Sequence, residues 1–85
     1  MKNIIMYTGP MCAFCDAAKR LFKRNNVSFK EIDIGNDVTI REEMIKKSNG
    51  RRTVPQIFIE DSHIGGYEEL RALEKNGELK NILGN

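Results

Sequence analysis

The sequence contains no apolar run approaching the about 20 residues that a membrane-spanning helix requires. Its first apolar run, residues 3–7, reaches Gly9 and Pro10 before the hydrophobic region of a signal peptide would be complete. We therefore expect no membrane association and place the protein in the cytoplasm. In that reducing compartment, a lone pair of cysteines is expected to be catalytic or metal-binding rather than structural.

A strong charge of one sign is also lacking. The 85 residues include 14 Lys and Arg against 12 Asp and Glu, which gives a net charge of +2, and the two signs are mixed along the chain. This charge is too weak to indicate a nucleic-acid-binding surface, so no nucleic-acid partner is expected. With 40% apolar residues, the chain is expected to fold as one domain, residues 1–85, around a modest core.

Only two cysteines are present, Cys12 and Cys15, and they form a CxxC motif. As a structural disulfide they would close a loop of four residues, which contributes only about 2 kcal/mol. An intrachain zinc site needs more ligands than the single histidine, His63, could add. His63 itself is expected to be a surface or edge residue. Two cysteines this close could also be small buried apolar residues.

A reactive dithiol fits the placement of the pair better. Cys12 lies where a helical pattern begins, and the unpaired N–H groups of a helix N-terminus stabilise a thiolate. Cys15 lies one turn inside the helix and is expected to be more enclosed. The two thiols are therefore expected to differ, with Cys12 as the reactive one.

The hydrophobic periodicity predicts strands alternating with helices. Helices are expected in three regions. The first begins at Ala13, and the second follows an N-cap at Asp37 and has Gly50 at its C′ position. Residues 67–85 are expected to form one or two helical segments divided at Gly77. Strands are expected at 3–7, 27–34, 56–60 and 63–65, with a tight turn at 61–62. The first two strands should be parallel and the last two should form a hairpin, which gives an α/β architecture: a four-stranded mixed sheet with helices on both faces.

Three segments carry a family resemblance. The stretches YTGPMCAFCDAAKRLF (7–22), TVPQIF (53–58) and GGYEEL (65–70), in this order and spacing, resemble the glutaredoxins, in particular the small bacterial dithiol members. The resemblance implies the thioredoxin fold and a glutathione-disulfide oxidoreductase that reduces disulfide-bonded and glutathionylated proteins. It further implies glutathione as the reducing cosubstrate, a monomer, and no metal in the dithiol form.

The resemblance also implies roles for individual residues. Cys12 would be the nucleophile and Cys15 the resolving thiol. A cis bond between Val54 and Pro55 would present the Val54 backbone to glutathione, the N–H groups near Tyr67 would receive one ligand carboxylate, and Arg41 the other. The full set expected to bind glutathione is Phe14, Arg41, Thr53, Val54, Pro55, Gly66, Tyr67, Glu68 and Glu69.

The chain departs from the family pattern at three positions. Ala13 and Phe14 replace the proline and tyrosine of the usual Cys-Pro-Tyr-Cys motif, and Gly9 stands where a lysine commonly lies. Loss of that lysine predicts weaker glutathione binding and a less acidic Cys12. Two alternatives follow: a dimer that holds a 2Fe–2S cluster, and an electron donor to ribonucleotide reductase served by thioredoxin reductase.

Overall fold

The computed structural model describes residues 2–84, which form four strands and four helices. No helix within this range is long and apolar enough to cross a membrane. In chain order the elements are β1 (Ile4–Thr8), α1 (Ala13–Arg24), β2 (Lys30–Asp33), α2 (Val38–Lys47), β3 (Gln56–Ile59), β4 (Ser62–Gly65), α3 (Tyr67–Lys75) and α4 (Glu78–Leu83).

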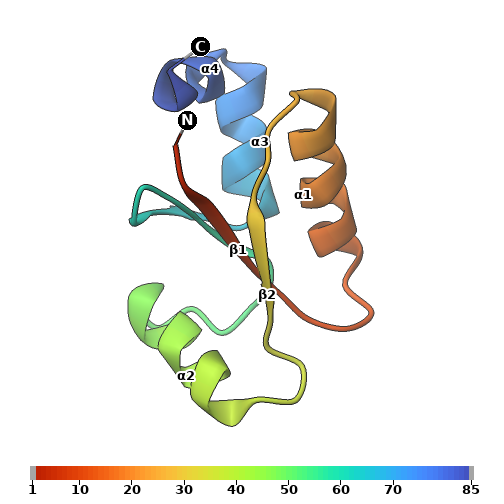
Figure 1. Cartoon of the computed structure of the whole chain (residues 1–85), viewed down its shortest axis with the longest axis vertical. Coiled ribbons are helices and arrows are strands. Elements are labelled where there is room, and N and C mark those ends of the chain that lie inside the picture. Colours follow the sequence, from red (N-terminus) through yellow and green to blue (C-terminus); the bar gives the residue numbers. More distant parts are fainter. Residues whose placement is uncertain (1, 85) are drawn as a thin grey trace.

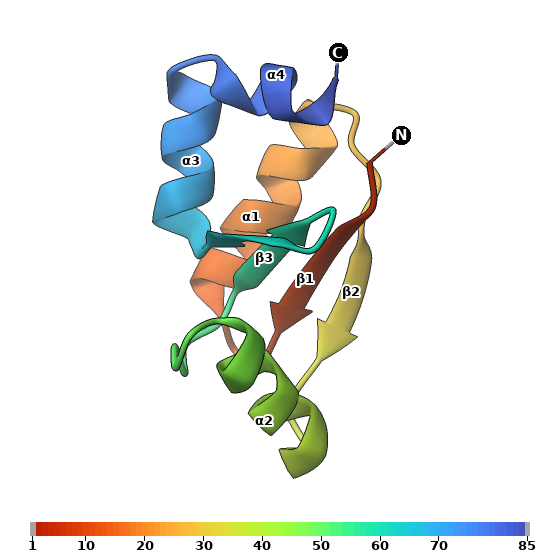
Figure 2. The ribbon, with the colours of Figure 1, turned by 90° about the vertical axis from the view of Figure 1, so that its left-hand side faces the viewer.

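The strands form one mixed sheet in the order β2-β1-β3-β4. β1 pairs in parallel with β2, and β3 is antiparallel to both β1 and β4 (Figure 2). The carboxyl end of β1 therefore lies beside the amino end of β3. This juxtaposition brings the loop that follows β1, which carries the cysteines, next to the Thr-Val-Pro segment that precedes β3. The expected mixed sheet is confirmed.

Helices cover both faces of the sheet, as expected (Figure 1). Alternate side chains of each central strand point to opposite faces, so β1 and β3 are apolar on both. On one face, Met6 and Ile57 pack with Leu21 and Phe22 of α1 and with Leu70 of α3. The other face is covered by α2, whose Met44 packs with Ile34 and with the strand residues Tyr7 and Phe58.

The hairpin turn lies one residue earlier than predicted. Glu60 and Asp61, rather than residues 61–62, form the two-residue turn, and both have positive φ, 50° and 67°. Two such residues in succession characterise the type I′ turn, whose twist matches that of the flanking strands. Ile59 then pairs with Ser62, so β4 begins at Ser62.

Helices α1 and α2 are each followed by an asparagine in the left-handed conformation. Asn26 and Asn49 occupy the C′ positions after α1 and α2, each with φ of 57°. The N–H of the next residue returns to the third carbonyl from the cap, Val27 to Phe22 and Gly50 to Ile45, which is the Schellman pattern. The prediction of Gly50 at C′ is therefore wrong by one position, because asparagine also tolerates the left-handed conformation. β2 spans only Lys30–Asp33 and is shorter than the predicted 27–34.

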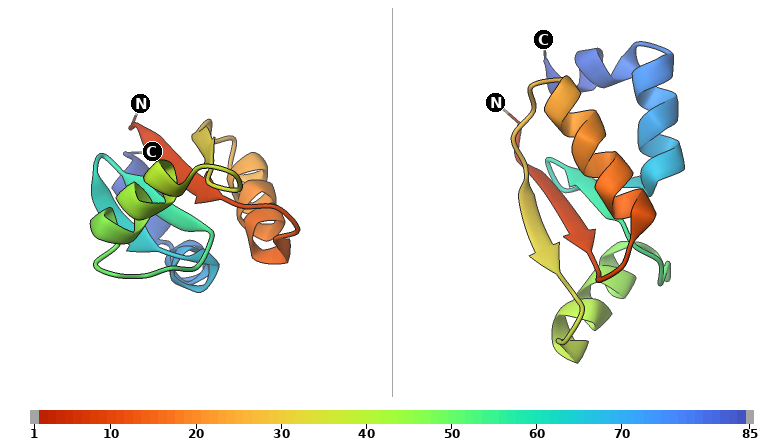
Figure 3. Two further views of the ribbon diagram at one scale, coloured as in Figure 1. Left: turned by 90° about the horizontal axis from the view of Figure 1, so that it is seen from below. Right: turned by 90° about the vertical axis from the view of Figure 1, so that its right-hand side faces the viewer.

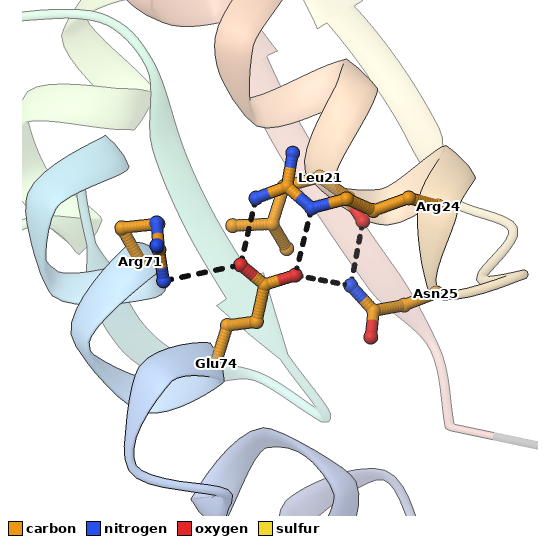
Figure 4. Close-up of polar contacts among 5 residues, drawn as sticks. All are labelled: Leu21, Arg24, Asn25, Arg71 and Glu74. Atoms are coloured by element: carbon orange, nitrogen blue, oxygen red, sulfur yellow. Dashed lines mark hydrogen bonds and ion pairs between the residues drawn. The ribbon is translucent and has the colours of Figure 1, made fainter.

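A polar cluster joins the C-terminal ends of α1 and α3 (Figure 4). The Glu74 carboxylate accepts hydrogen bonds from Arg24 at 2.7 and 2.9 Å and from Asn25 Nδ2 at 2.7 Å, and Arg71 lies 3.4 Å away. The Glu74 side chain is only 17% exposed. This Glu74 cluster (Arg24, Asn25, Arg71 and Glu74) ties together the two helices whose opposite ends frame the cysteines.

Candidate active site

Cys12 is the N-cap of α1, as the sequence predicts. Its Sγ accepts a hydrogen bond from the N–H of Cys15 at 3.0 Å, one of the donors that have no acceptor within the helix. Cys12 is half-buried, whereas Cys15 is only 2% exposed. The two sulfurs are joined in a disulfide. The structure therefore shows the oxidised pair, with the outer sulfur at the helix N-terminus and the inner one enclosed.

A groove runs beside Cys12. It has a volume of about 280 Å³. The Val54 carbonyl oxygen lies 3.6 Å from Cys12 Sγ and brings the groove to the disulfide, and the Val54–Pro55 bond is cis. The residues that line it come from three segments far apart in the sequence: Phe14 from α1; Arg51, Thr53, Val54 and Pro55 from the loop before β3; and Gly66, Tyr67, Glu68 and Glu69 at the start of α3.

Two aromatic rings form one wall of the groove. Phe14, between the cysteines, is 58% exposed and stacks on Tyr67, with ring centroids 5.9 Å apart and planes inclined by 20°. Phe14 belongs to the first turn of α1 and Tyr67 to the first turn of α3. The two helices lie side by side (Figure 3), so their packing sets the width of this wall.

The start of α3 is held by an ionic cluster. Glu69 Oε1 accepts from the Gly66 N–H at 2.6 Å and from Arg51 Nη1 at 3.0 Å. The hydrogen bond from Gly66 is the main cause that lowers the pKa of Glu69 below its usual value, and Arg51 adds to it against the opposing effect of burial. Gly65 has φ of 120°, and a Cβ there would collide with the Glu69 carboxylate. A glycine is therefore required for this close approach.

The sequence matches the glutaredoxin family model over residues 4–64, which is most of the chain. It is 48% identical over 83 residues to glutaredoxin 3 of Escherichia coli (strain K12), an alignment that covers 98% of this chain and 99% of that protein. The chain belongs to the glutaredoxin family. It is a glutathione-dependent thiol-disulfide oxidoreductase whose redox pair is the CxxC motif.

Solved glutaredoxins have the same fold. The solution structure of glutaredoxin from Brucella melitensis matches with a TM-score of 0.86 at 43% identity, covering 98% of this chain and 89% of that one. A buckwheat glutaredoxin solved in complex with glutathione matches with a TM-score of 0.87 at 24% identity, covering 98% and 77%. These matches confirm the thioredoxin fold that the resemblance implies.

Most residues expected to bind glutathione line the groove of this glutaredoxin. The exception is Arg41, on α2, which is not among the described residues that line it. Arg51 lines it instead and was not predicted. Its position two residues before Thr53 was the available signal, but the sequence gives no reason to prefer it to the neighbouring Arg52.

A second hollow lies on the other face of the sheet. It has a volume of about 360 Å³ and is lined by Ile5, Tyr7, Lys47, Phe58 and Asp61. Its lining includes neither Val54, whose carbonyl oxygen lies 3.6 Å from Cys12 Sγ, nor Phe14 of the CxxC segment, so its larger volume does not make it the site of the redox chemistry. Among residues 2–84, no group of three or more His, Cys, Asp and Glu side chains is placed to hold a metal ion.

Proposed function

We propose that the groove binds glutathione beside Cys12 and that this protein reduces both protein disulfides and glutathionylated thiols. The observation that supports this most strongly is the contact of Val54 with Cys12, because it joins the groove to the more accessible sulfur of the redox pair. A peptide lying along the Val54 backbone would pair with it much as a neighbouring strand does. The ligand thiol would then point at Cys12.

The charges around the groove suit a zwitterionic tripeptide. The Gly66 N–H is already bonded to Glu69, so the next N–H groups of α3, at Tyr67 and Glu68, are the ones that would receive a ligand carboxylate. Glu68 and Glu69 would meet the ligand amino group. Arg51 would attract the other carboxylate, and we keep Arg41 as a second candidate for that role. The buckwheat glutaredoxin, which has the same fold, was solved in complex with glutathione, and this supports glutathione as the ligand.

For a glutathionylated substrate, Cys12 alone carries the reaction. The Cys12 thiolate attacks the glutathionyl sulfur, which forms a Cys12–glutathione disulfide and releases the substrate thiol. A second glutathione attacks the glutathionyl sulfur of that mixed disulfide. Oxidised glutathione leaves and the Cys12 thiolate returns, which its position at the helix N-terminus makes a good leaving group.

For a protein disulfide, both cysteines take part. Cys12 attacks one substrate sulfur and releases the other as a thiol. Cys15 then attacks Cys12 Sγ, which releases the second substrate thiol and forms the Cys12–Cys15 disulfide seen in the structure. Two molecules of glutathione restore the dithiol: the first forms a mixed disulfide with Cys12, and the second removes it as oxidised glutathione.

The decisive experiment compares three proteins in a glutathione-coupled assay. Cys12→Ser is expected to abolish turnover of both substrates, because it removes the attacking sulfur. Cys15→Ser should lose protein-disulfide reduction and keep reduction of a glutathionylated peptide. Activity that persists in Cys12→Ser would refute the mechanism.

Two further experiments test the alternative functions. Reduction by thioredoxin reductase but not by glutathione would assign the ribonucleotide-reductase alternative, which Gly9 favours. A brown dimer after anaerobic reconstitution with iron, sulfide and glutathione would assign the 2Fe–2S cluster. We expect neither result, and we propose a monomer that works in the cytoplasm.

A further inference from the structure

His63 lies on β4, is not among the described residues that line the groove, and takes part in a chain of hydrogen bonds that runs through the buried Gln56. Its ring is half-buried against Phe58, with ring centroids 5.0 Å apart, and its Nε2 lies 2.7 Å from Oε1 of Gln56. Gln56, the first residue of β3, is fully buried. Buried polar groups nearly always have partners, so the partners of this amide define its orientation.

The donors and acceptors of the chain fit in one way only. Gln56 Nε2 donates to the backbone oxygen of Thr53 at 3.1 Å and to Thr53 Oγ1 at 3.2 Å. The reversed amide would place Oε1 against that carbonyl oxygen, which is repulsive. Oε1 of Gln56 therefore faces His63 and must accept, so His63 Nε2 carries the hydrogen.

The hydrogen-bond chain ends at the groove. Thr53 is exposed and lines the groove, and its hydroxyl accepts from Gln56. A hydroxyl that accepts from one side is free to donate on the other, so its hydrogen is available to an acceptor in the groove. Hydrogen bonds that run in one direction polarise one another and strengthen the last donor.

We propose that His63 is a positioning residue for glutathione: through Gln56 it orients the Thr53 hydroxyl, which donates a hydrogen bond to an oxygen of the bound tripeptide. The inference rests on the proposed glutathione groove. It extends that site by two residues, His63 and Gln56, that do not touch the ligand.

Burial and the charge of Arg51 favour the neutral ring that the hydrogen-bond chain needs. Burial lowers the pKa of His63 below its usual value, the positive charge of Arg51 lowers it further, and Glu69 opposes both. The neutral ring, which carries a single N–H hydrogen, is therefore favoured at neutral pH. The hydrogen-bond chain places that hydrogen on Nε2.

The first test reads this tautomer directly. His63 is the only histidine of the chain, so its ring nitrogens give unambiguous signals in long-range ¹H–¹⁵N NMR spectra. We expect a neutral ring with its hydrogen on Nε2 at pH 7.5. A hydrogen on Nδ1 would overturn the proposal, because Gln56 Oε1 would then have no donor in His63. This measurement uses the wild-type protein and does not depend on whether a variant folds.

The second test separates binding from chemistry. His63→Leu should raise KM for a glutathionylated peptide about fivefold, equivalent to about 1 kcal/mol for one hydrogen bond, and leave kcat unchanged. His63→Gln keeps an N–H donor at nearly the same reach, so its KM should remain near that of the wild type. A purely structural role would affect both variants, since both lose the ring that packs on Phe58.

The outcomes distinguish this inference from the proposed function. If the wild-type protein does not reduce the glutathionylated peptide with glutathione, the groove assignment is wrong. If the wild type is active and His63→Leu has the same KM, only the role of His63 is wrong. An equal rise in KM for His63→Leu and His63→Gln would likewise overturn it, by assigning the effect to ring packing.

Discussion

Gly9 lies three residues before Cys12 and carries no side chain. A Cβ added there would lie 3.3 Å from Cγ2 of Val54, so Val54 would have to shift by a few tenths of an ångström. Val54 also lines the groove. A lysine at this position would therefore bring both a favourable charge and a steric cost, which a suitable set of variants can separate.

We predict that Gly9→Lys lowers KM for a glutathionylated peptide about two- to fivefold, since an exposed charge pair contributes at most about 1 kcal/mol. The cation should also stabilise the Cys12 thiolate. Alkylation of the reduced protein by iodoacetamide should therefore reach its maximal rate at lower pH than in the wild type.

Two control variants separate these effects. Gly9→Ala adds only the Cβ that meets Val54, and Gly9→Met adds length without charge. Both should bind no better than the wild type. If Gly9→Met improves KM as much as Gly9→Lys does, charge is not the cause.

Structural features that depend on residues near each other in the sequence were predictable, whereas a contact between distant residues was not. The spacing of Cys12 and Cys15 and the change of periodicity at Ala13 predict the N-cap thiol, because both depend on one turn of helix. Arg51, by contrast, donates a hydrogen bond to Glu69, which lies 18 residues away in the sequence. No local pattern relates the two side chains.

At the scale of the elements, the errors lie at their ends. The sequence predicts the hairpin, but its turn is fixed by strand pairing. Ile57 and Ile59 must face the core that contains α1, and a shift by one residue would turn both away from it. The turn therefore falls on Glu60 and Asp61 although neither is a glycine.

The Glu74 cluster provides a prediction about the packing of α1 against α3. Glu74→Gln keeps the shape of the side chain but removes its charge. We expect the free energy of unfolding at pH 7, measured with urea, to fall by about 1 kcal/mol, a modest value because the Arg24 side chain is 49% exposed. Glu42→Gln, on the exposed surface of α2, should change it by less than about 0.5 kcal/mol.

The effect of Glu74 should depend on pH. Hydrogen bonds from Arg24, and next from Asn25, lower the pKa of Glu74 in the folded protein, although burial opposes them. A group with a lowered folded pKa stabilises fully above its unfolded pKa and loses this contribution as pH falls through the folded value. The difference between wild type and Glu74→Gln should therefore shrink below about pH 4. A constant difference down to pH 2 would contradict this.

At the scale of the whole molecule, alternating patterns predict the layers but not every neighbour across them. Apolar residues on both faces of β1 and β3 require helices on both sides, which the structure has. The sequence does not determine how far α2 reaches along its face, so it could not show whether Arg41 lies at the groove. In the structure, the helical walls of the groove come from α1 and α3 on the other face of the sheet, and Arg41 of α2 is not among the described residues that line it.

The short helix α4 tests how far stability and function are separable. It lies at the end of the molecule where α1 ends, away from the cysteines at the start of α1 (Figure 3). Its Leu79 is 1% exposed and packs in the same core as Leu21 and Phe22 of α1. The core therefore joins α4 to the helix that carries the redox pair.

We predict that Leu79→Ala lowers the free energy of unfolding by about 2–4 kcal/mol, through lost burial and the cavity left in the core. KM and kcat for a glutathionylated peptide should remain those of the wild type at temperatures where the variant is folded, because Leu79 is not among the described residues that line the groove. Val38→Ala, at a 72% exposed position, is the matched control and should change stability by less than about 0.5 kcal/mol. A raised KM in folded Leu79→Ala would show that the core positions the groove as well as stabilising the fold.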